Sequence, residues 1–170
     1  MTRPDWWLDE QLHAGAEHLD PSYVAGYDAK SQVDPTPDID ALVALGLGEG
    51  STVVDIVHTR NALHQIPDFW KVIALQRIHD VLGPGGILRL RDLVFDLEPD
   101  AIGEGIDEWK AGAVDDPPRG YTAPEFAEHV RAEHSTFTWL LEPALERVGF
   151  DIVDREVGRN VCAAYTCRRR

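Results

Sequence analysis

The chain has 170 residues, with 16 Lys and Arg against 30 Asp and Glu, so its formal charge is −14. This length suits one globular domain, and 44 % hydrophobic with 27 % charged residues is an ordinary globular composition. The negative charge repels phosphate backbones, which excludes non-specific nucleic-acid binding. No apolar run reaches the roughly 18 residues of a membrane span, and no apolar signal-peptide stretch opens the chain, so we expect a cytoplasmic protein without a membrane partner.

Residues 1–50 are predicted to form an N-terminal helical cover segment. Asp5 is suitable as an N-cap, and apolar residues at helical intervals predict a first helix that ends at Asp20-Pro21. After a proline-rich loop over 34–37, the spacing of apolar residues predicts a short helix that Asp38 caps and Gly46 ends.

A strand, a helix and a second strand follow, and together they predict a right-handed βαβ unit with two parallel strands. Residues 52–57 are mostly apolar and β-branched, which is typical of a strand buried on both faces. Residues 68–82 carry apolar side chains at helical spacing, and the glycine-rich turn 83–86 ends that helix. Residues 87–95 alternate apolar side chains with arginines and predict the second strand.

The C-terminal half predicts two to three helices and a closing hairpin. Residues 98–118 are predicted as a helix in an insert, and Thr122 with Glu125 has the spacing of a capping box that opens the next helix. A further helix is expected over 137–148. Residues 150–157 and 160–166 then predict the two strands of a hairpin that turns around Gly158-Arg159.

The two cysteines predict a reducing compartment. Cys162 and Cys167 are five residues apart, so on one extended segment their side chains point to opposite faces and cannot form a disulfide with each other. They also lack the spacing of a zinc site.

The histidine spacing predicts no metal site. Metal-binding helices usually place two histidines at i and i+4. His58 and His64 are six residues apart, and His129 and His134 are five apart, so neither pair has that spacing.

The order of these elements resembles the second half of class I S-adenosylmethionine-dependent methyltransferases. Four segments carry the resemblance: Asp55–Gln65 looks like that family's fourth strand and its loop, Val81–Leu88 like the L-x-P-G-G turn into the fifth strand, Leu145–Ile152 like the L-x-x-x-G-F entry to the closing hairpin, and Tyr23–Asp28 like the segment that closes over the cofactor. The resemblance spans roughly Tyr23 to Cys167.

The chain departs from that family where the cofactor motif belongs. The family's first strand ends in an acidic residue and a glycine-rich turn, which lets the backbone approach the cofactor. Here Gly48–Asp55 resembles the first strand, yet Asp55–Asn61 already resembles the fourth, and the two share Asp55. This overlap indicates an internal loss of three strand–helix units, roughly 75 residues. The expected fold is a reduced Rossmann-like α/β domain over 51–170, with four strands in the order hybrid 1/4, 5, 7, 6, a C-terminal antiparallel hairpin and helices on both faces.

The resemblance implies S-adenosylmethionine as cofactor and a small molecule as methyl acceptor. His64 would be the base on the substrate side, and Arg91 and Asp92, at the end of the second strand, would contact the substrate. The residues that the resemblance places at the cofactor are Tyr23, Tyr27, Asp55, Thr59, Arg60, Asn61 and Ala62. Simpler structural roles stay open: His64 as a helix-start histidine, Asn61 as a cap, and Arg91 with Asp92 as an ion pair.

Two functions therefore remain in competition. One is a methyltransferase that binds the cofactor in an atypical way or in a site completed by a second chain. The other is a non-catalytic methyltransferase-like binding or dimerisation module. The hybrid strand supports the second, because an apolar strand at a sheet edge invites pairing with another chain, and for the same reason we expect a homodimer.

Overall fold

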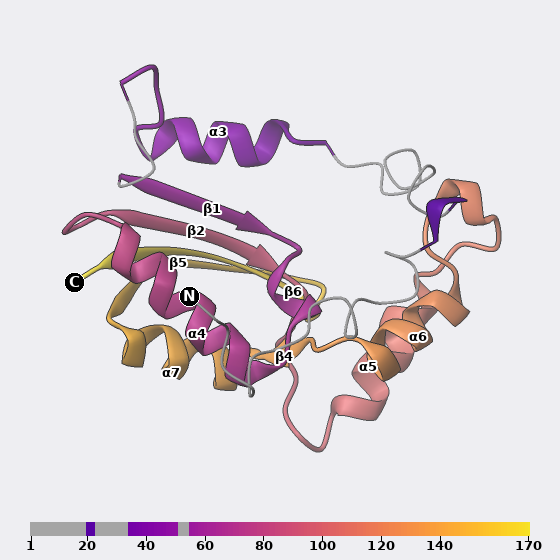
Figure 1. Cartoon of the computed structure of the whole chain (residues 1–170). Helices are drawn as coiled ribbons and strands as arrows, with labels where there is room; N and C mark the ends of the chain where they lie inside the picture. The colour runs from indigo at the N-terminus through magenta and orange to yellow at the C-terminus, as the bar shows by residue number, and fades with distance from the viewer. Residues whose placement is uncertain (1–19, 23–33, 51–54) are drawn as a thin grey trace.

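The structure is a computed structural model, and it describes residues 20–22, 34–50 and 55–170. Figure 1 shows a mixed arrangement of helices and strands around one four-stranded sheet, with a separate two-stranded sheet, β3-β4. The helices are α3 (Thr36–Ala44), α4 (Asp68–Val81), α5 (Ile102–Ala111), α6 (Ala123–Ala132) and α7 (Thr138–Val148), with the 3-10 turns η1 (Leu63–Gln65) and η2 (Pro117–Arg119). The strands are β1 (Ile56–Arg60), β2 (Ile87–Asp92), β3 (Val94–Phe95), β4 (Thr136–Phe137), β5 (Phe150–Gly158) and β6 (Cys162–Arg169).

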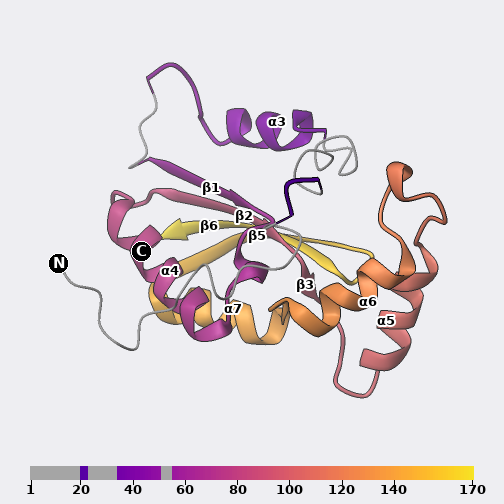
Figure 2. The ribbon, with the colours of Figure 1, turned by 45° about the vertical axis from the view of Figure 1, so that its right-hand side comes forward.

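The four-stranded sheet has the order β1-β2-β6-β5. β1 and β2 are parallel, with Ile56 opposite Ile87, and β6 is antiparallel to both β2 and β5. Figure 2 shows β1 at one side of this sheet and the β5–β6 hairpin at the other. This is the predicted order of a hybrid strand followed by the counterparts of the fifth, seventh and sixth strands. The topology thus confirms the predicted fold class, a reduced methyltransferase-like α/β fold.

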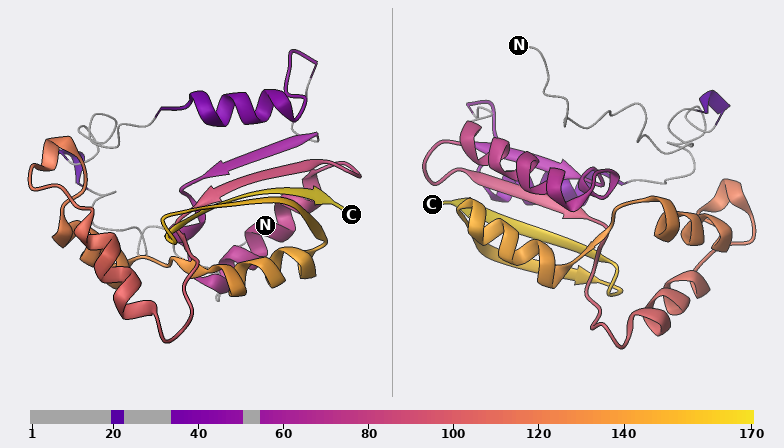
Figure 3. Two further views of the ribbon diagram at one scale, coloured as in Figure 1. Left: turned by 180° about the vertical axis from the view of Figure 1, so that it is seen from behind. Right: turned by 60° about the horizontal axis from the view of Figure 1, so that its bottom comes forward.

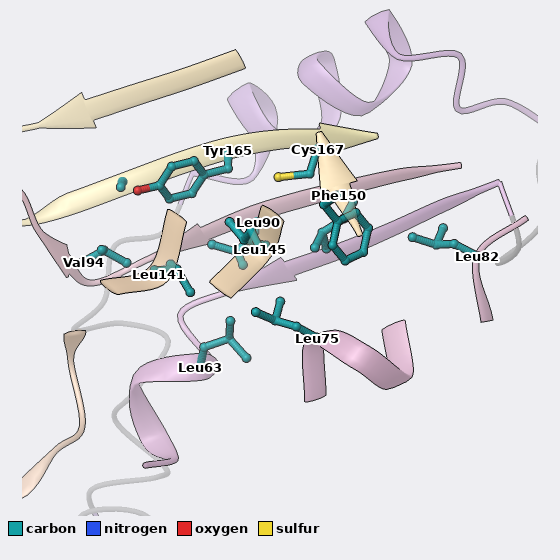
Figure 4. Packing of buried hydrophobic residues seen from close by; sticks show 12 residues of the cluster. Leu63, Leu75, Leu82, Leu90, Val94, Leu141, Leu145, Phe150, Tyr165 and Cys167 are labelled. Atoms are coloured by element: carbon teal, nitrogen blue, oxygen red, sulfur yellow. The ribbon is translucent and has the colours of Figure 1, made fainter. Parts of the chain in front are cut away.

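One face of the sheet carries the main core. In the right-hand view of Figure 3, α4 and α7 lie side by side over this face. Figure 4 shows how Leu75 of α4 and Leu145 of α7 point toward Phe150, Tyr165 and other side chains of the sheet. Each fully buried side chain of this size stabilises the fold by about 1.5–3 kcal/mol, so this layer is the principal support of the sheet.

The opposite face of the sheet is polar and is covered in part by α3. Alternation along the strands places Arg60, Arg89 and Arg91 on this face, away from the leucines of β2. Asp38 of α3 forms ion pairs with Arg60 and Arg91. Helices thus lie on both faces, as expected, although the contact of α3 with the sheet is ionic.

Some boundaries differ from the predicted ones. The strand expected to be buried on both faces begins at Ile56 and lies at the edge of the sheet. His58 is exposed and the other four residues of β1 are only partly buried. Residues 51–54 lie outside the described part. The single strand expected over 87–95 is broken at Leu93, where the backbone N–H bonds to the Asp92 carboxylate at 2.8 Å. The helix expected over 98–118 is shorter and covers Ile102–Ala111.

Other predicted signals are confirmed at residue level. The capping box forms, because the Thr122 N–H donates to the Glu125 carboxylate at 2.8 Å. α7 ends at Gly149, whose φ of +117° is left-handed, and a Cβ there would lie 2.8 Å from Nε2 of His79. The hairpin turns at Arg159 and Asn160, both with positive φ, one residue later than predicted. Among the helices of the described ranges, none combines the length and apolarity that crossing a bilayer requires.

Candidate functional site

The candidate site lies at the carboxyl ends of β1 and β2, where open α/β sheets bind ligands. Asp92 is the last residue of β2, and the loop that follows β1 folds back over its side chain. Oδ2 of Asp92 accepts hydrogen bonds from the backbone N–H groups of Ala62, at 3.0 Å, and Leu63, at 2.7 Å. One carboxylate therefore fixes the whole turn that carries His64.

The imidazole of His64 is held by the same carboxylate. Nδ1 of His64 lies 2.5 Å from Oδ1 of Asp92, and their side chains are only 7 % and 1 % exposed. Burial acts to raise the pKa of Asp92, but the hydrogen bond and the charge of His64, with the N–H groups of Leu63 and Leu93, outweigh it and hold that pKa below its ordinary value. Asp92 is thus a carboxylate that orients the ring and leaves Nε2 facing the other way.

Nε2 of His64 faces a second carboxylate, that of Glu133. The Oε2 atom of Glu133 lies 3.2 Å from Nε2 of His64 and 2.8 Å from Nδ1 of His129, and it accepts a hydrogen bond from Gln65 at 3.0 Å. On the far side of the His129 ring, Nε2 is 2.7 Å from Oγ of Ser135. We call His64, His129 and Glu133 the histidine cluster; its side chains are 7 %, 12 % and 13 % exposed.

Backbone and lysine contacts hold the parts of the histidine cluster together. The N–H of His134, just after α6, donates to the backbone oxygen of His64 at 2.7 Å. The buried ammonium of Lys71, from α4, donates to the backbone oxygens of Ile66 and His134. The 3-10 turn η1, helix α4 and the end of α6 are therefore tied to one another around the site.

An aromatic wall borders the histidine cluster on the side of α5 and α6. The Trp109 ring packs edge-on against His129, with 5.5 Å between the ring centroids, and contacts Phe126 at 4.5 Å. Phe95 of β3 lies behind it, 5.8 Å from Trp109. Such surroundings keep water from one side of the imidazoles and strengthen the electrostatic contacts among them.

The structure brings together only part of the set of residues that the sequence singles out. His64, Asp92 and the backbone of Ala62 meet, as described above. Arg60 and Arg91 instead lie on the opposite face of the sheet, with Asp38, so Arg91 and Asp92 do not pair.

The remaining predicted cofactor residues are dispersed. Asp55 precedes β1 and lines a cleft of about 680 Å³ with the 83–86 turn, at the amino end of the strand and so far from the site. Thr59 lies half-buried within β1. Asn61 has a left-handed φ of +49°, and its backbone N–H donates to the backbone oxygen of Arg91 at 2.9 Å. Tyr23 and Tyr27 lie outside the described residues.

Sequence reasoning missed His129 and Glu133. These two residues are four apart at the end of α6, the spacing that places side chains on one face of a helix. That spacing was present in the sequence, but histidines were compared there only with other histidines and not with carboxylates.

The described loops beside the site lack the glycine-rich turn of the family's cofactor motif. The segments that follow β1 and β2 in this part of the chain, 61–67 and 93–101, contain no glycine. The N–H groups of Ala62 and Leu63, which an approaching ligand would need, are bonded to Asp92. The glycines at 46–50 and 83–86 precede β1 and β2 and lie at the opposite end of the strands.

No protein-family model matches the sequence, and no curated protein matches it. Among solved structures, TnmH is similar at 16 % identity and a TM-score of 0.44, over 73 % of this chain and 32 % of that chain. The N-methyltransferase NodS from Bradyrhizobium japonicum WM9, solved with S-adenosyl-L-homocysteine, is similar at 14 % identity and a TM-score of 0.41. The match covers 74 % of this chain and 50 % of that chain. A methyltransferase from Mesorhizobium loti is similar at 16 % identity and a TM-score of 0.44, over 77 % of this chain and 75 % of that chain. The chain thus spans about a third of the length of TnmH and half that of NodS.

Proposed function

We propose that this protein is a methyltransferase that acts on a small-molecule acceptor, with His64 as the general base. The observation that carries the proposal is the buried His64–Asp92 pair at the carboxyl ends of two parallel strands of a methyltransferase-like sheet. A histidine whose one nitrogen is fixed by a carboxylate is well suited to take a proton at the other nitrogen.

In this proposal the chain's own residues perform acid–base work. Nε2 of His64 takes the proton from a hydroxyl or amine of the acceptor, and Asp92 stabilises the imidazolium that forms. Glu133, 3.2 Å from Nε2, must yield this position to the acceptor when it binds. The aromatic wall of Trp109 and Phe126 offers apolar surface beside the base, which suits a partly apolar acceptor.

The proposed methyl donor is S-adenosylmethionine, which would supply an activated methyl group. Because the described loops beside the site contain no glycine and the N–H groups of Ala62 and Leu63 are bonded to Asp92, we propose that cofactor binding uses residues outside the described ranges, Tyr23 and Tyr27 among them, or a second copy of the chain. We also propose that the protein is a homodimer joined at the edge strand β1 and that it resides in the cytoplasm, where its cysteines stay reduced.

The second candidate function is a non-catalytic binding or dimerisation module. The observation that favours it is the turn after β1, where the N–H groups of Ala62 and Leu63 donate to Asp92 and are not free to bind a cofactor. The described residues 61–67 of this turn also include no glycine. A module of this kind would keep the sheet and its helical cover but would bind no cofactor.

Calorimetry with S-adenosylmethionine separates the two functions. Binding tighter than about 100 μM, which is about 5.5 kcal/mol, supports the methyltransferase, and no heat at millimolar cofactor supports the module. If the cofactor binds, the role of His64 as the base is tested by measuring the transfer of a labelled methyl group to a panel of hydroxyl and amine compounds. The variant His64→Asn should keep the cofactor affinity and lose about 10²- to 10⁴-fold in transfer rate. His58→Asn, an exposed histidine of β1, is the matched control and should behave like the wild type.

A further inference from the structure

We propose that the histidine cluster is a binding site for a divalent transition-metal ion, Zn²⁺ being the ion that its ligands suit best. The side chains of His64, His129 and Glu133 each offer one ligand atom, and these three atoms all lie within 4.8 Å of one another. The site belongs to side chains from η1 and the end of α6, which are far apart in the sequence.

The donor set is that of a zinc site with an open position. Two imidazole nitrogens and one carboxylate oxygen form three of four tetrahedral ligands, and the fourth position is left for water or a substrate atom. With metal–ligand bonds of about 2.0–2.2 Å, adjacent tetrahedral ligands stand about 3.4 Å apart. The separations from Glu133 Oε2 are 3.2 Å to Nε2 of His64 and 2.8 Å to Nδ1 of His129, so these two distances are close to the tetrahedral value. The two imidazole nitrogens lie within 4.8 Å of each other, and an ion between them would set that distance to about 3.4 Å.

The second nitrogen of each imidazole is already held in the way that metal-binding histidines require. Nδ1 of His64 is fixed by the Asp92 carboxylate at 2.5 Å, and Nε2 of His129 is fixed by Oγ of Ser135 at 2.7 Å. Such outer partners set the tautomer and the ring orientation and raise the basicity of the ligand nitrogen. They leave Nε2 of His64 and Nδ1 of His129 directed at the same carboxylate.

The cluster is also rigid and shielded before any ion arrives. The His134–His64 backbone hydrogen bond and the two backbone contacts of Lys71 fix the separation of the two ligand-bearing segments. The Trp109 ring, nearly perpendicular to the His129 ring, packs against it and restricts its motion. A preformed cluster of this kind loses little conformational entropy on binding, which favours affinity.

This inference does not depend on the methyltransferase proposal, but it has a consequence for it. While Nε2 of His64 coordinates an ion it cannot accept a proton, so metal at the histidine cluster is expected to block the base. Metal binding and cofactor binding are measured in separate titrations. A chain that binds no Zn²⁺ can therefore still bind S-adenosylmethionine, and the reverse also holds.

The test uses the full chain, freed of any histidine tag and treated with a chelator before dialysis. Titration with Zn²⁺ in a calorimeter should show saturable binding of one ion per chain. Co²⁺ should give the visible absorption of a four-coordinate ion, and added Zn²⁺ should abolish that absorption. His129→Asn and Glu133→Gln should each weaken Zn²⁺ binding at least 100-fold, and Asp92→Asn, which alters a positioning residue, about 10- to 100-fold.

His58→Asn is the matched control, because this histidine lies exposed on β1 outside the cluster, and its Zn²⁺ affinity should equal that of the wild type. Circular dichroism establishes that each variant is folded. The Co²⁺ spectrum of the wild-type chain tests the proposal even if a cluster variant fails to fold. Absence of saturable binding in the wild type, an octahedral Co²⁺ spectrum, or equal affinity in His129→Asn and His58→Asn would overturn the proposal.

Discussion

The carboxylate of Asp92 joins the end of β2 to the imidazole of His64, with 2.5 Å between Oδ1 and Nδ1. The same carboxylate accepts hydrogen bonds from the N–H groups of Ala62 and Leu63. Asp92 therefore fixes both the position of the imidazole ring and the path of the backbone after β1. Stability and site geometry are therefore coupled at Asp92, and a change there should affect both.

Replacement of Asp92 by Asn should lower the free energy of unfolding by about 3 kcal/mol. The amide keeps one acceptor oxygen, but its NH₂ group replaces the other oxygen and faces N–H donors such as those of Ala62 and Leu63. Because Asp92 is only 1 % exposed, the donors that lose their acceptor stay buried without a hydrogen bond. Urea unfolding at neutral pH, followed by circular dichroism, measures the change. Asp107→Asn is the control, since that carboxylate is 80 % exposed and forms a surface ion pair with Lys110, and it should change the stability by less than about 0.5 kcal/mol. Equal stabilities of the two variants would contradict the role of Asp92.

The contribution of Asp92 to stability should disappear in acid. The pKa of Asp92 in the folded chain is lowered, whereas in the unfolded chain it is about 3.9. The unfolded state therefore binds the proton first as the pH falls, so the stabilisation is complete above the unfolded pKa and is lost as the pH drops through the folded pKa. Urea unfolding at several pH values between about 6 and 2 should show the wild type losing more stability than Asp92→Asn. A difference between the two proteins that stays constant with pH would refute this assignment.

The elements predicted well from the sequence are those whose signals are local. The helical spacing over 68–82, the glycine-rich turn 83–86 and the Thr122–Glu125 capping box all concern neighbouring residues, and the structure reproduces each of them. The sheet order followed from the resemblance to methyltransferases, because the order of strands in space is a property of the whole fold. A pattern along the chain carries no such information.

The features that were missed depend on tertiary contacts. The break after Asp92 arises because its carboxylate turns to bind the loop after β1, and nothing in the alternation of residues 87–95 signals that partner. His64 and Glu133 are likewise distant in the sequence, and only the docking of α6 beside η1 brings them together. The predicted strand order placed the first strand at the sheet edge, where the structure has β1, but the apolar run predicted burial on both faces, and β1 is only partly buried.

The two cysteines should differ sharply in reactivity. Cys167 is completely buried in the main core, and burial raises the pKa of its thiol to about 12, which suppresses the reactive thiolate. Cys162 is partly exposed on the other face of β6. A thiol reagent at pH 8 should therefore label Cys162 in the folded chain and label Cys167 only after urea is added, as peptide mass spectrometry would show. In Cys162→Ser, labelling should require unfolding; labelling at the wild-type rate would contradict the burial of Cys167.

A proline at His58 should convert the proposed homodimer into a folded monomer. The backbone N–H of Asn61 donates to the backbone oxygen of Arg91, and the backbone oxygen of Asp55 accepts from the N–H of Ile87. Alternation therefore directs the N–H of His58 away from β2, toward the outer side of this edge strand. A proline there removes a donor that points away from β2 and that an incoming strand would use, and edge strands tolerate it. Light scattering after size-exclusion chromatography should give twice the chain mass for the wild type and one chain mass for His58→Pro.

Thr59→Pro is the matched control for this pairing, because the same alternation directs the N–H of Thr59 toward β2. Its proline removes a hydrogen bond inside the sheet and should lower the free energy of unfolding, whereas His58→Pro should leave it within about 1 kcal/mol of the wild-type value once dimer dissociation is taken into account. A wild-type chain that is monomeric at micromolar concentration would refute the edge-to-edge dimer. A dimer that persists in a folded His58→Pro would place the interface elsewhere than at β1.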